Sequence, residues 1–371
     1  MAPDLFEPYR IGRLELKNRF VRSATFDQTA DSSGAVTDNS VELYRKLGQG
    51  RVGLIVSGHA FVSGHGQSAV GQYGAHSDDM IPGLCRLVQA AHQGGAKIAL
   101  QFNHCGMYSG YLRGKGVVPL AVSRMPEIDR PHREMTGEEI ETIIADFASA
   151  AVRGRDAGFD AIQLGAAGGY LMSQFLSPLF NRRTDQWGGS AENRRMFLLE
   201  VIRKVRQALG ADFPLMIKFG VQDDREGGLT LNEGLETARQ MVETGIDAME
   251  ISGTALAAAI RVMREGEPER AYFRETAAAV KRAVKVPIMV VGGIRSLQMA
   301  KDIVDSGNAD LILMCRPFIR EPGLVARWQR GETEPAKCIS CNKCLAILGK
   351  GEPLECGEER RLREEADNES K

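Results

Sequence analysis

Two short apolar runs, Gly53-Leu-Ile-Val56 and Ile288-Met-Val-Val291, show the pattern that repeats through this chain. Neither run alternates polar and apolar residues, which is typical of a parallel strand covered by other elements. Similar β-branched, apolar runs recur along most of the sequence. Eight strands are therefore expected, over residues 19–25, 52–60, 97–104, 160–167, 214–220, 247–253, 287–293 and 309–317.

Amphipathic stretches between these runs predict helices, among them 137–157, 191–209, 231–244 and 272–284. Thr136 before Glu138 and Glu139, and Thr230 before Glu233, are typical helix starts. Repeated strand–helix units favour an α/β fold with one closed (β/α)8 TIM barrel over an open doubly wound sheet. We expect the barrel over residues 1–330 and a short cysteine-rich extension with a charged tail over 331–371.

Composition excludes several classes of function. The 371 residues carry a formal net charge of −1, so no basic surface for nucleic acid or an anionic membrane is expected. No apolar run is long enough for a membrane span. Asp4, Glu7 and Pro8 stand where a secretory signal would be apolar, which predicts a cytoplasmic protein.

In a barrel of this kind the loops that follow the strands build the active face. Two of these loops are long, over residues 104–135 and 168–190, and long loops in a compact domain are often functional. After the last two strands stand Gly292-Gly293 and Arg316. Close-approaching backbone amides and a guanidinium suit a phosphate group. The alternative is that the glycines form only a tight turn.

The seven cysteines are unevenly placed. Cys85, Cys105 and Cys315 are scattered, whereas Cys338, Cys341, Cys344 and Cys356 fall within 19 residues. In an intracellular protein such a cluster favours a metal site over disulfides. Three close cysteines and a distant fourth fit a [4Fe–4S] cluster better than the paired spacing of a zinc site. Zinc, or no metal, remains an alternative.

Two further motifs carry a family resemblance. One runs from Leu5-Phe-Glu-Pro8 to Leu16-Lys-Asn-Arg19, and the other from Asn181-Arg-Arg-Thr-Asp-Gln-Trp-Gly-Gly-Ser190 to Asn193-Arg194. With the groups at the strand ends, they resemble the Old Yellow Enzyme family of FMN-binding oxidoreductases over about residues 5–330. The Cys-Ile-Ser-Cys-Asn-Lys-Cys run resembles the branch of that family with a cysteine cluster, which includes 2,4-dienoyl-CoA reductase and trimethylamine dehydrogenase.

The resemblance implies an FMN site. Its expected residues are Ser23, Ala24 and Thr25 along the flavin, Gly58 and Gln101 at the pyrimidine side, Lys218 near the N1/O2 end, and Gly292, Gly293, Cys315 and Arg316 around the phosphate. Lys218 has two rival interpretations. Strand alternation also points it toward Glu250, as a buried ion pair, and a barrel lysine can form a Schiff base in an aldolase-like enzyme.

The resemblance also implies hydride transfer between the flavin and an organic substrate. Tyr170 stands at the position of the family's proton donor, with His104 and His59 as further acid–base candidates, although any of the three can be structural. The family's two substrate-binding side chains are replaced by Gly165 and Gly168. Losing both donors predicts weak binding of simple enones, and space for a bulkier substrate.

Several partners are consistent with this interpretation. NAD(P)H at the flavin, or a separate redox protein at the cysteine cluster, can supply electrons, and a homo-oligomer is an option. Two other functions stay open: oxidative demethylation or dehydrogenation of an amine, and a non-catalytic flavin and iron–sulfur electron-transfer module.

Overall fold

The computed structural model describes residues 4–254 and 266–369. Eight parallel strands pair side by side, and pairing between β4 (Leu54–Val56) and β6 (Lys97–Asn103) closes the ring. This closure confirms the predicted (β/α)8 barrel over the open sheet. The other barrel strands are β3 (Phe20–Arg22), β9 (Ala161–Ala166), β10 (Leu215–Gly220), β11 (Ala248–Ser252), β12 (Ile288–Val290) and β13 (Leu311–Met314).

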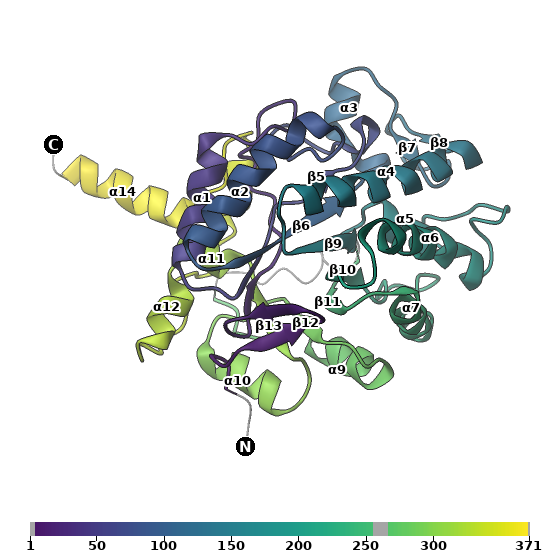
Figure 1. Cartoon of the computed structure of the whole chain (residues 1–371). Helices are drawn as coiled ribbons and strands as arrows, with labels where there is room; N and C mark the ends of the chain where they lie inside the picture. The colour runs from purple at the N-terminus through teal and green to yellow at the C-terminus, as the bar shows by residue number, and fades with distance from the viewer. Residues whose placement is uncertain (1–3, 255–265, 370–371) are drawn as a thin grey trace.

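Helices surround the barrel in Figure 1. They are α1 (Asp38–Gln49), α2 (Ile81–Gln93), α4 (Gly137–Asp156), α6 (Ala191–Leu209), α7 (Leu231–Thr244), α9 (Arg274–Ala283), α10 (Leu297–Asp305) and α12 (Leu324–Gln329). The predicted starts of α4 and α7 are correct. The Thr136 and Thr230 side chains each accept a hydrogen bond from the backbone amide three residues on. The Glu139 and Glu233 side chains accept one from the backbone amide of that threonine, so each helix starts with a capping box.

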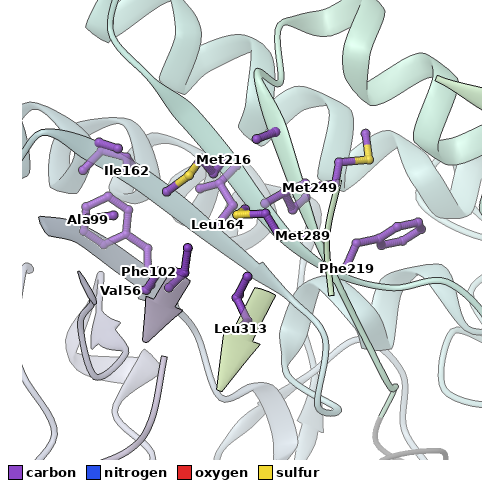
Figure 2. Packing of buried hydrophobic residues seen from close by; sticks show 14 of the residues in the cluster. Val56, Ala99, Phe102, Ile162, Leu164, Met216, Phe219, Met249, Met289 and Leu313 are labelled. Carbon is purple, nitrogen blue, oxygen red and sulfur yellow. The ribbon is translucent and has the colours of Figure 1, made fainter. Parts of the chain in front are cut away.

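The barrel interior is closely packed with apolar side chains. Figure 2 shows Ala99, Met216, Leu313 and their neighbours converging from strands far apart in the sequence. Every residue of β9, β12 and β13 is buried, which explains why these runs do not alternate. The core therefore supports a rigid ring of strands whose carboxyl ends carry the loops.

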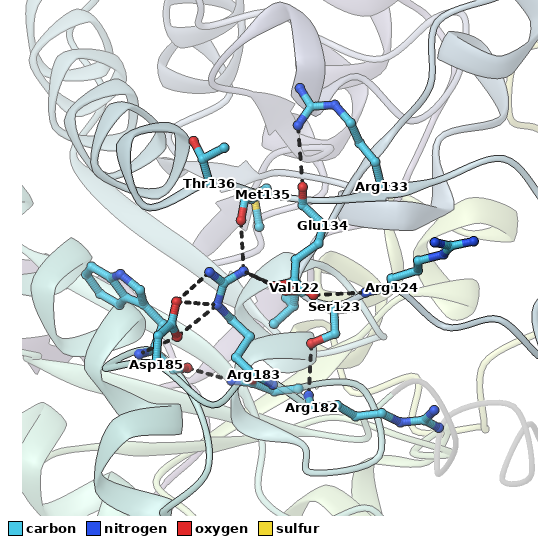
Figure 3. A network of polar contacts seen from close by, with 12 residues as sticks. Val122, Ser123, Arg124, Arg133, Glu134, Met135, Thr136, Arg182, Arg183 and Asp185 are labelled. Atoms are coloured by element: carbon cyan, nitrogen blue, oxygen red, sulfur yellow. Dashed lines mark hydrogen bonds and ion pairs between the residues drawn. The ribbon is translucent and has the colours of Figure 1, made fainter.

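The two long loops are ordered and tied together by Arg183, from the motif 181–190. Its Nη1 atom donates to the carbonyls of Val122 (3.0 Å) and Met135 (2.8 Å), and its Nη2 atom lies 2.6 Å from Asp185 (Figure 3). Ser123 accepts a hydrogen bond from the amide of Arg182. The two carbonyls directly follow the short paired strands Leu120–Ala121 and Arg133–Glu134, so Arg183 satisfies them where that pairing ends, and this part of the motif has a structural role.

Short elements complete these loops and the extension. They are η1 (Gly64–Gly66), η2 (Asp78–Met80), η3 (Gly106–Tyr108), α3 (Gly110–Gly114), α5 (Leu171–Leu176), α11 (Arg316–Arg320), α13 (Lys343–Gly349) and α14 (Gly357–Glu369), with strands β5 (Ala60–Phe61), β7 (Leu120–Ala121) and β8 (Arg133–Glu134).

The hairpin of β1 (Tyr9–Ile11) and β2 (Leu14–Leu16) precedes the barrel, and its apolar Ile11 and Leu16 are buried. At the other end, the cysteine-rich extension over residues 331–371, hereafter the cysteine segment, packs back onto the barrel. The amide of Leu354 donates to the carbonyl of Asp27 at 2.8 Å. The charged α14 projects away from the barrel (Figure 1). Among the described residues, no helix combines the length and apolar character that a membrane crossing requires.

Candidate functional site

A cavity opens at the carboxyl ends of strands β3 and β10 to β13. Its empty volume is about 1050 Å³, part of it open to solvent, which suits a cofactor-sized ligand. The structure brings together at this cavity seven of the residues singled out from the sequence: Thr25, Lys218, Gly292, Gly293, Cys315, Arg316 and Cys338. Leu345, Leu348 and Leu354 add an apolar wall from the cysteine segment.

The backbone conformation at positions 292 and 293 favours glycine. Gly292 and Gly293 have φ of +113° and +79°, and a Cβ on Gly293 would lie 2.1 Å from the carbonyl oxygen of Arg270. Within residues 4–254 and 266–369, neither of their amides donates to another group, and the buried Nε of Arg295 has no partner. Backbone amides and two guanidiniums, from Arg295 and Arg316, therefore meet at one end of the cavity, as an anion requires.

Lys218 enters the cavity from β10 and is held by an ion pair. Its Nζ atom lies 3.0 Å from Glu250 on the adjacent strand and 3.1 Å from the Ser23 hydroxyl, which donates to Glu250 at 2.5 Å. Burial alone would lower the pKa of Lys218, but the Glu250 carboxylate raises it above its usual value. A lysine that keeps its proton is a poor nucleophile, so this geometry disfavours the Schiff-base interpretation.

Gln163 completes this network and was not identified from the sequence. It donates to the free carboxylate oxygen of Glu250 at 3.0 Å and accepts from Gln101 at 2.6 Å. It is the only strongly polar residue of β9, two positions before Gly165, and that isolated polarity was the available signal. The side-chain amide of Gln101 and the hydroxyl of Ser23, both expected at the flavin, therefore donate hydrogen bonds within this network inside the barrel.

Tyr170 and His59 lie together beside this network. The Tyr170 hydroxyl is 3.5 Å from Nε2 of His59, and their ring centroids are 5.2 Å apart. Burial raises the pKa of Tyr170 to about 12 and, with the charge of Lys218, lowers the pKa of His59 to about 4. At neutral pH the pair therefore consists of a protonated phenol and a neutral imidazole.

His104 lies apart from the cavity lining, beneath the loop that contains η1. Its Nδ1 atom accepts from the amide of Gly106 at 3.1 Å, and its Nε2 atom is buried without a partner in the described structure. Burial lowers the pKa of His104 to about 3. Gly58 packs against the side chains of Asp27 and Tyr73. Its amide donates to the Tyr44 hydroxyl at 2.7 Å.

The two glycines expected at the positions of the family's substrate donors differ in conformation. Gly165 is buried in β9, and a Cβ there would lie 2.9 Å from the carbonyl oxygen of Phe102. Gly168 is exposed, with φ of +66°, a region that side-chain-bearing residues rarely adopt. The local backbone therefore suits glycine at both positions, and neither the half-buried Ala24 nor these glycines lines the main cavity.

The four clustered cysteines line a second, smaller cavity together with Arg316 and Asn342. All seven cysteines are free thiols in the described structure. Burial raises the pKa of Cys338 and Cys344, while the nearby Arg316 charge opposes that increase. Among the described residues no three His, Cys, Asp or Glu side chains are gathered closely enough to hold a metal ion. The iron–sulfur and zinc hypotheses therefore remain predictions.

Known proteins resemble this chain over its whole barrel. An NADH oxidase from Thermoanaerobacter brockii is 35% identical over 344 residues, 92% of this chain and 53% of that protein. An NADPH dehydrogenase from Geobacillus sp. (strain WCH70) is 35% identical over 324 residues, 87% of this chain and 92% of that protein. Among solved structures, a complex of 2-naphthoyl-CoA reductase with 2-naphthoyl-CoA superposes with a TM-score of 0.88 at 31% identity, covering 95% of this chain and 56% of that one.

The chain spans about half the length of the NADH oxidase and of the naphthoyl-CoA reductase. The sequence pattern of one family matches residues 4–334, nearly the entire barrel. This match confirms the resemblance to FMN-binding oxidoreductases of the Old Yellow Enzyme type. The chain belongs to the NADH:flavin oxidoreductase / NADH oxidase family.

Proposed function

We propose that this chain binds FMN in the main cavity and reduces an activated carbon–carbon double bond of an organic substrate. The observation that carries the proposal is the cavity itself. It places a lysine ammonium, Lys218, and an anion-binding end, Gly292, Gly293 and Arg316, in one hollow at the catalytic face of a barrel.

The residues fit FMN at both ends. The free amides of Gly292 and Gly293 and the guanidiniums of Arg295 and Arg316 would donate hydrogen bonds to the phosphate. Lys218, kept protonated by Glu250, would stabilise negative charge on the ring, and Thr25 lines the same cavity. Bound FMN would supply hydride transfer, and the protein would supply position and electric field.

Tyr170 would supply the proton that accompanies the hydride. Its raised pKa keeps the hydroxyl protonated at neutral pH, so the donor is available when one alkene carbon needs a proton. The phenol would then recover a proton from water. His104 is the weaker candidate, because burial lowers its pKa to about 3 and its Nδ1 atom is already occupied by the amide of Gly106. Neither Tyr170 nor His104 lines the main cavity.

Substrate choice follows from Gly165 and Gly168. Without two side-chain donors the site would hold a substrate through other contacts, and the exposed Gly168 leaves room for a large one. The similarity to 2-naphthoyl-CoA reductase supports an unsaturated or aromatic acyl thioester as a substrate class. NADH or NADPH at the flavin would be the reductant, as the family description supports.

The cysteine segment would hold a [4Fe–4S] cluster, with zinc as the alternative. The supporting observation is that Cys338, Cys341, Cys344 and Cys356 share one small cavity, and that Cys338 also lines the main cavity. A redox centre there would be adjacent to the flavin site and could exchange electrons with a separate redox protein. Two other functions stay open, amine dehydrogenation or demethylation and electron transfer without catalysis.

Two measurements test this proposal. The visible spectrum of anaerobically purified protein, with iron and acid-labile sulfide analysis, should show FMN and about four of each per chain if the cluster is [4Fe–4S]. Anaerobic stopped-flow should show flavin reduced by NAD(P)H and reoxidised by an alkene. Reduction of the flavin by an amine would favour the dehydrogenase alternative. If the flavin is neither reoxidised by an alkene nor reduced by an amine, electron transfer without catalysis is favoured. The variant Y170F should slow only reoxidation, by about 100-fold or more.

A further inference from the structure

One side chain of the cysteine segment, Asn342, contacts the Arg316 guanidinium at the main cavity. Its amide oxygen accepts a hydrogen bond from Nη1 of Arg316 at 2.6 Å. Arg316 lines both cavities, whereas Asn342 belongs to the wall of the cysteine cavity. The two residues are 26 positions apart and lie on opposite sides of the boundary between the barrel and the extension.

The backbone around Asn342 is shaped to present this oxygen. Asn342 has φ of +59°, and Ser340 has φ of +61°, so the chain turns sharply twice between Cys338 and Cys344. Asparagine tolerates the left-handed region better than most side chains do. The Asn342 carbonyl then accepts from the amide of Leu345 at 2.9 Å, where α13 starts. Position 342 therefore combines a strained backbone with a side chain aimed at the barrel.

The segment is also fixed to the rest of the molecule. Lys343, next in the chain, lies 2.5 Å from Glu358 at the start of α14, and Arg295 donates to the carbonyl of Cys338 at 3.3 Å. Arg295 and Arg316 both line the anion-binding end of the main cavity. Each guanidinium there is thus held by an oxygen from the segment 338–342. A guanidinium held in this way loses less conformational freedom when it binds an anion.

From this arrangement we infer that Asn342 is a positioning residue for FMN binding: it orients Arg316 toward the phosphate and so makes flavin affinity depend on the cysteine segment. The inference rests on the proposed FMN site. It predicts an effect on the phosphate end, because Asn342 contacts Arg316 and does not line the cavity that receives the ring.

The test compares FMN with riboflavin, which lacks the phosphate. The full chain, resolved from its flavin, is titrated with each compound, and binding is followed by quenching of flavin fluorescence. N342G removes the amide oxygen but keeps a residue that accepts positive φ, so the backbone is preserved. N342D keeps an acceptor for Arg316 but adds a negative charge beside the phosphate site. R316A reports on the phosphate site itself.

We expect N342G to raise the Kd for FMN about tenfold and to leave the Kd for riboflavin unchanged, because a hydrogen bond to a charged group is lost only from the phosphate end. N342D should also weaken FMN and spare riboflavin, because its carboxylate neutralises Arg316 and repels the phosphate. Equal weakening of FMN and riboflavin in N342G, or no change for either, would overturn the inference. If R316A also fails to weaken FMN relative to riboflavin, the phosphate assignment fails as well, which separates the two outcomes.

Discussion

The Lys218 ammonium lies 3.0 Å from the Glu250 carboxylate, and Glu250 is completely buried. The pair joins β10 to β11 in register, and Ser23 and Gln163 satisfy the remaining carboxylate hydrogen bonds. Charges in the interior are stable only when paired in this way. The ion pair and the flavin interpretation are therefore compatible: Glu250 keeps Lys218 charged, and Lys218 faces the cavity.

Replacing Glu250 by Gln should destabilise the protein. The variant leaves the Lys218 ammonium buried without its counter-charge, and breaking a buried pair in this way costs about 3 kcal/mol. Urea unfolding measures the change. E236Q is the control, since the Glu236–Arg239 pair is exposed and should contribute less than about 1 kcal/mol. Equal effects of E250Q and E236Q would contradict the assigned role of Glu250.

Stability should increase as the pH rises from about 4 to 6.5. His59 and His104 have folded-state pKa values of about 4 and 3, below the usual 6.5, because burial disfavours their charged forms. Between the folded-state pKa of each histidine and 6.5, the unfolded chain binds more protons than the folded one. Acid therefore favours unfolding, by about 1.4 kcal/mol per unit of pKa difference. Urea midpoints across this range test it, and H59N and H104N should each flatten the profile.

Substituting Gly293 by Ala should impair FMN binding. The new Cβ would meet the carbonyl oxygen of Arg270, and the positive φ adds strain of about 1–2 kcal/mol. Gly307 is the matched control, because its φ of +69° is similar but its Cβ would point into open space. G307A should therefore show only the strain, whereas G293A should also raise the Kd for FMN by about tenfold or more. Equal FMN affinity in the two variants would count against the phosphate assignment.

Small cyclic enones should be poor substrates. Two missing donors, at Gly165 and Gly168, remove about 1–3 kcal/mol of orienting hydrogen bonds, or roughly five- to 150-fold in kcat/KM. Steady-state rates with 2-cyclohexenone test this expectation. G168H should not restore activity, since φ of +66° suits glycine. Efficient turnover by the unaltered chain would show that other groups hold the carbonyl.

Local sequence patterns were sufficient to predict the barrel. Runs such as Gly53-Leu-Ile-Val56 are buried wherever they occur, and Thr136 and Thr230 start helices through contacts only three residues long. The glycine pair 292–293 and Arg316 could also be assigned to one site, because successive barrel strands end at the same face. Such features depend on periodicity and on neighbours close in sequence, which a single chain displays directly.

Contacts between distant residues were decided only by the folded chain. Arg183 binds carbonyls 61 and 48 positions away, and Gln163 on β9 binds Glu250 on β11, past the intervening β10. Asn342 contacts Arg316 from another segment. Nothing in the local sequence encodes these pairings, because they arise when strand order and loop packing bring remote side chains within hydrogen-bonding distance. The same holds for the pKa values of Tyr170 and His59, which depend on burial that the whole barrel creates.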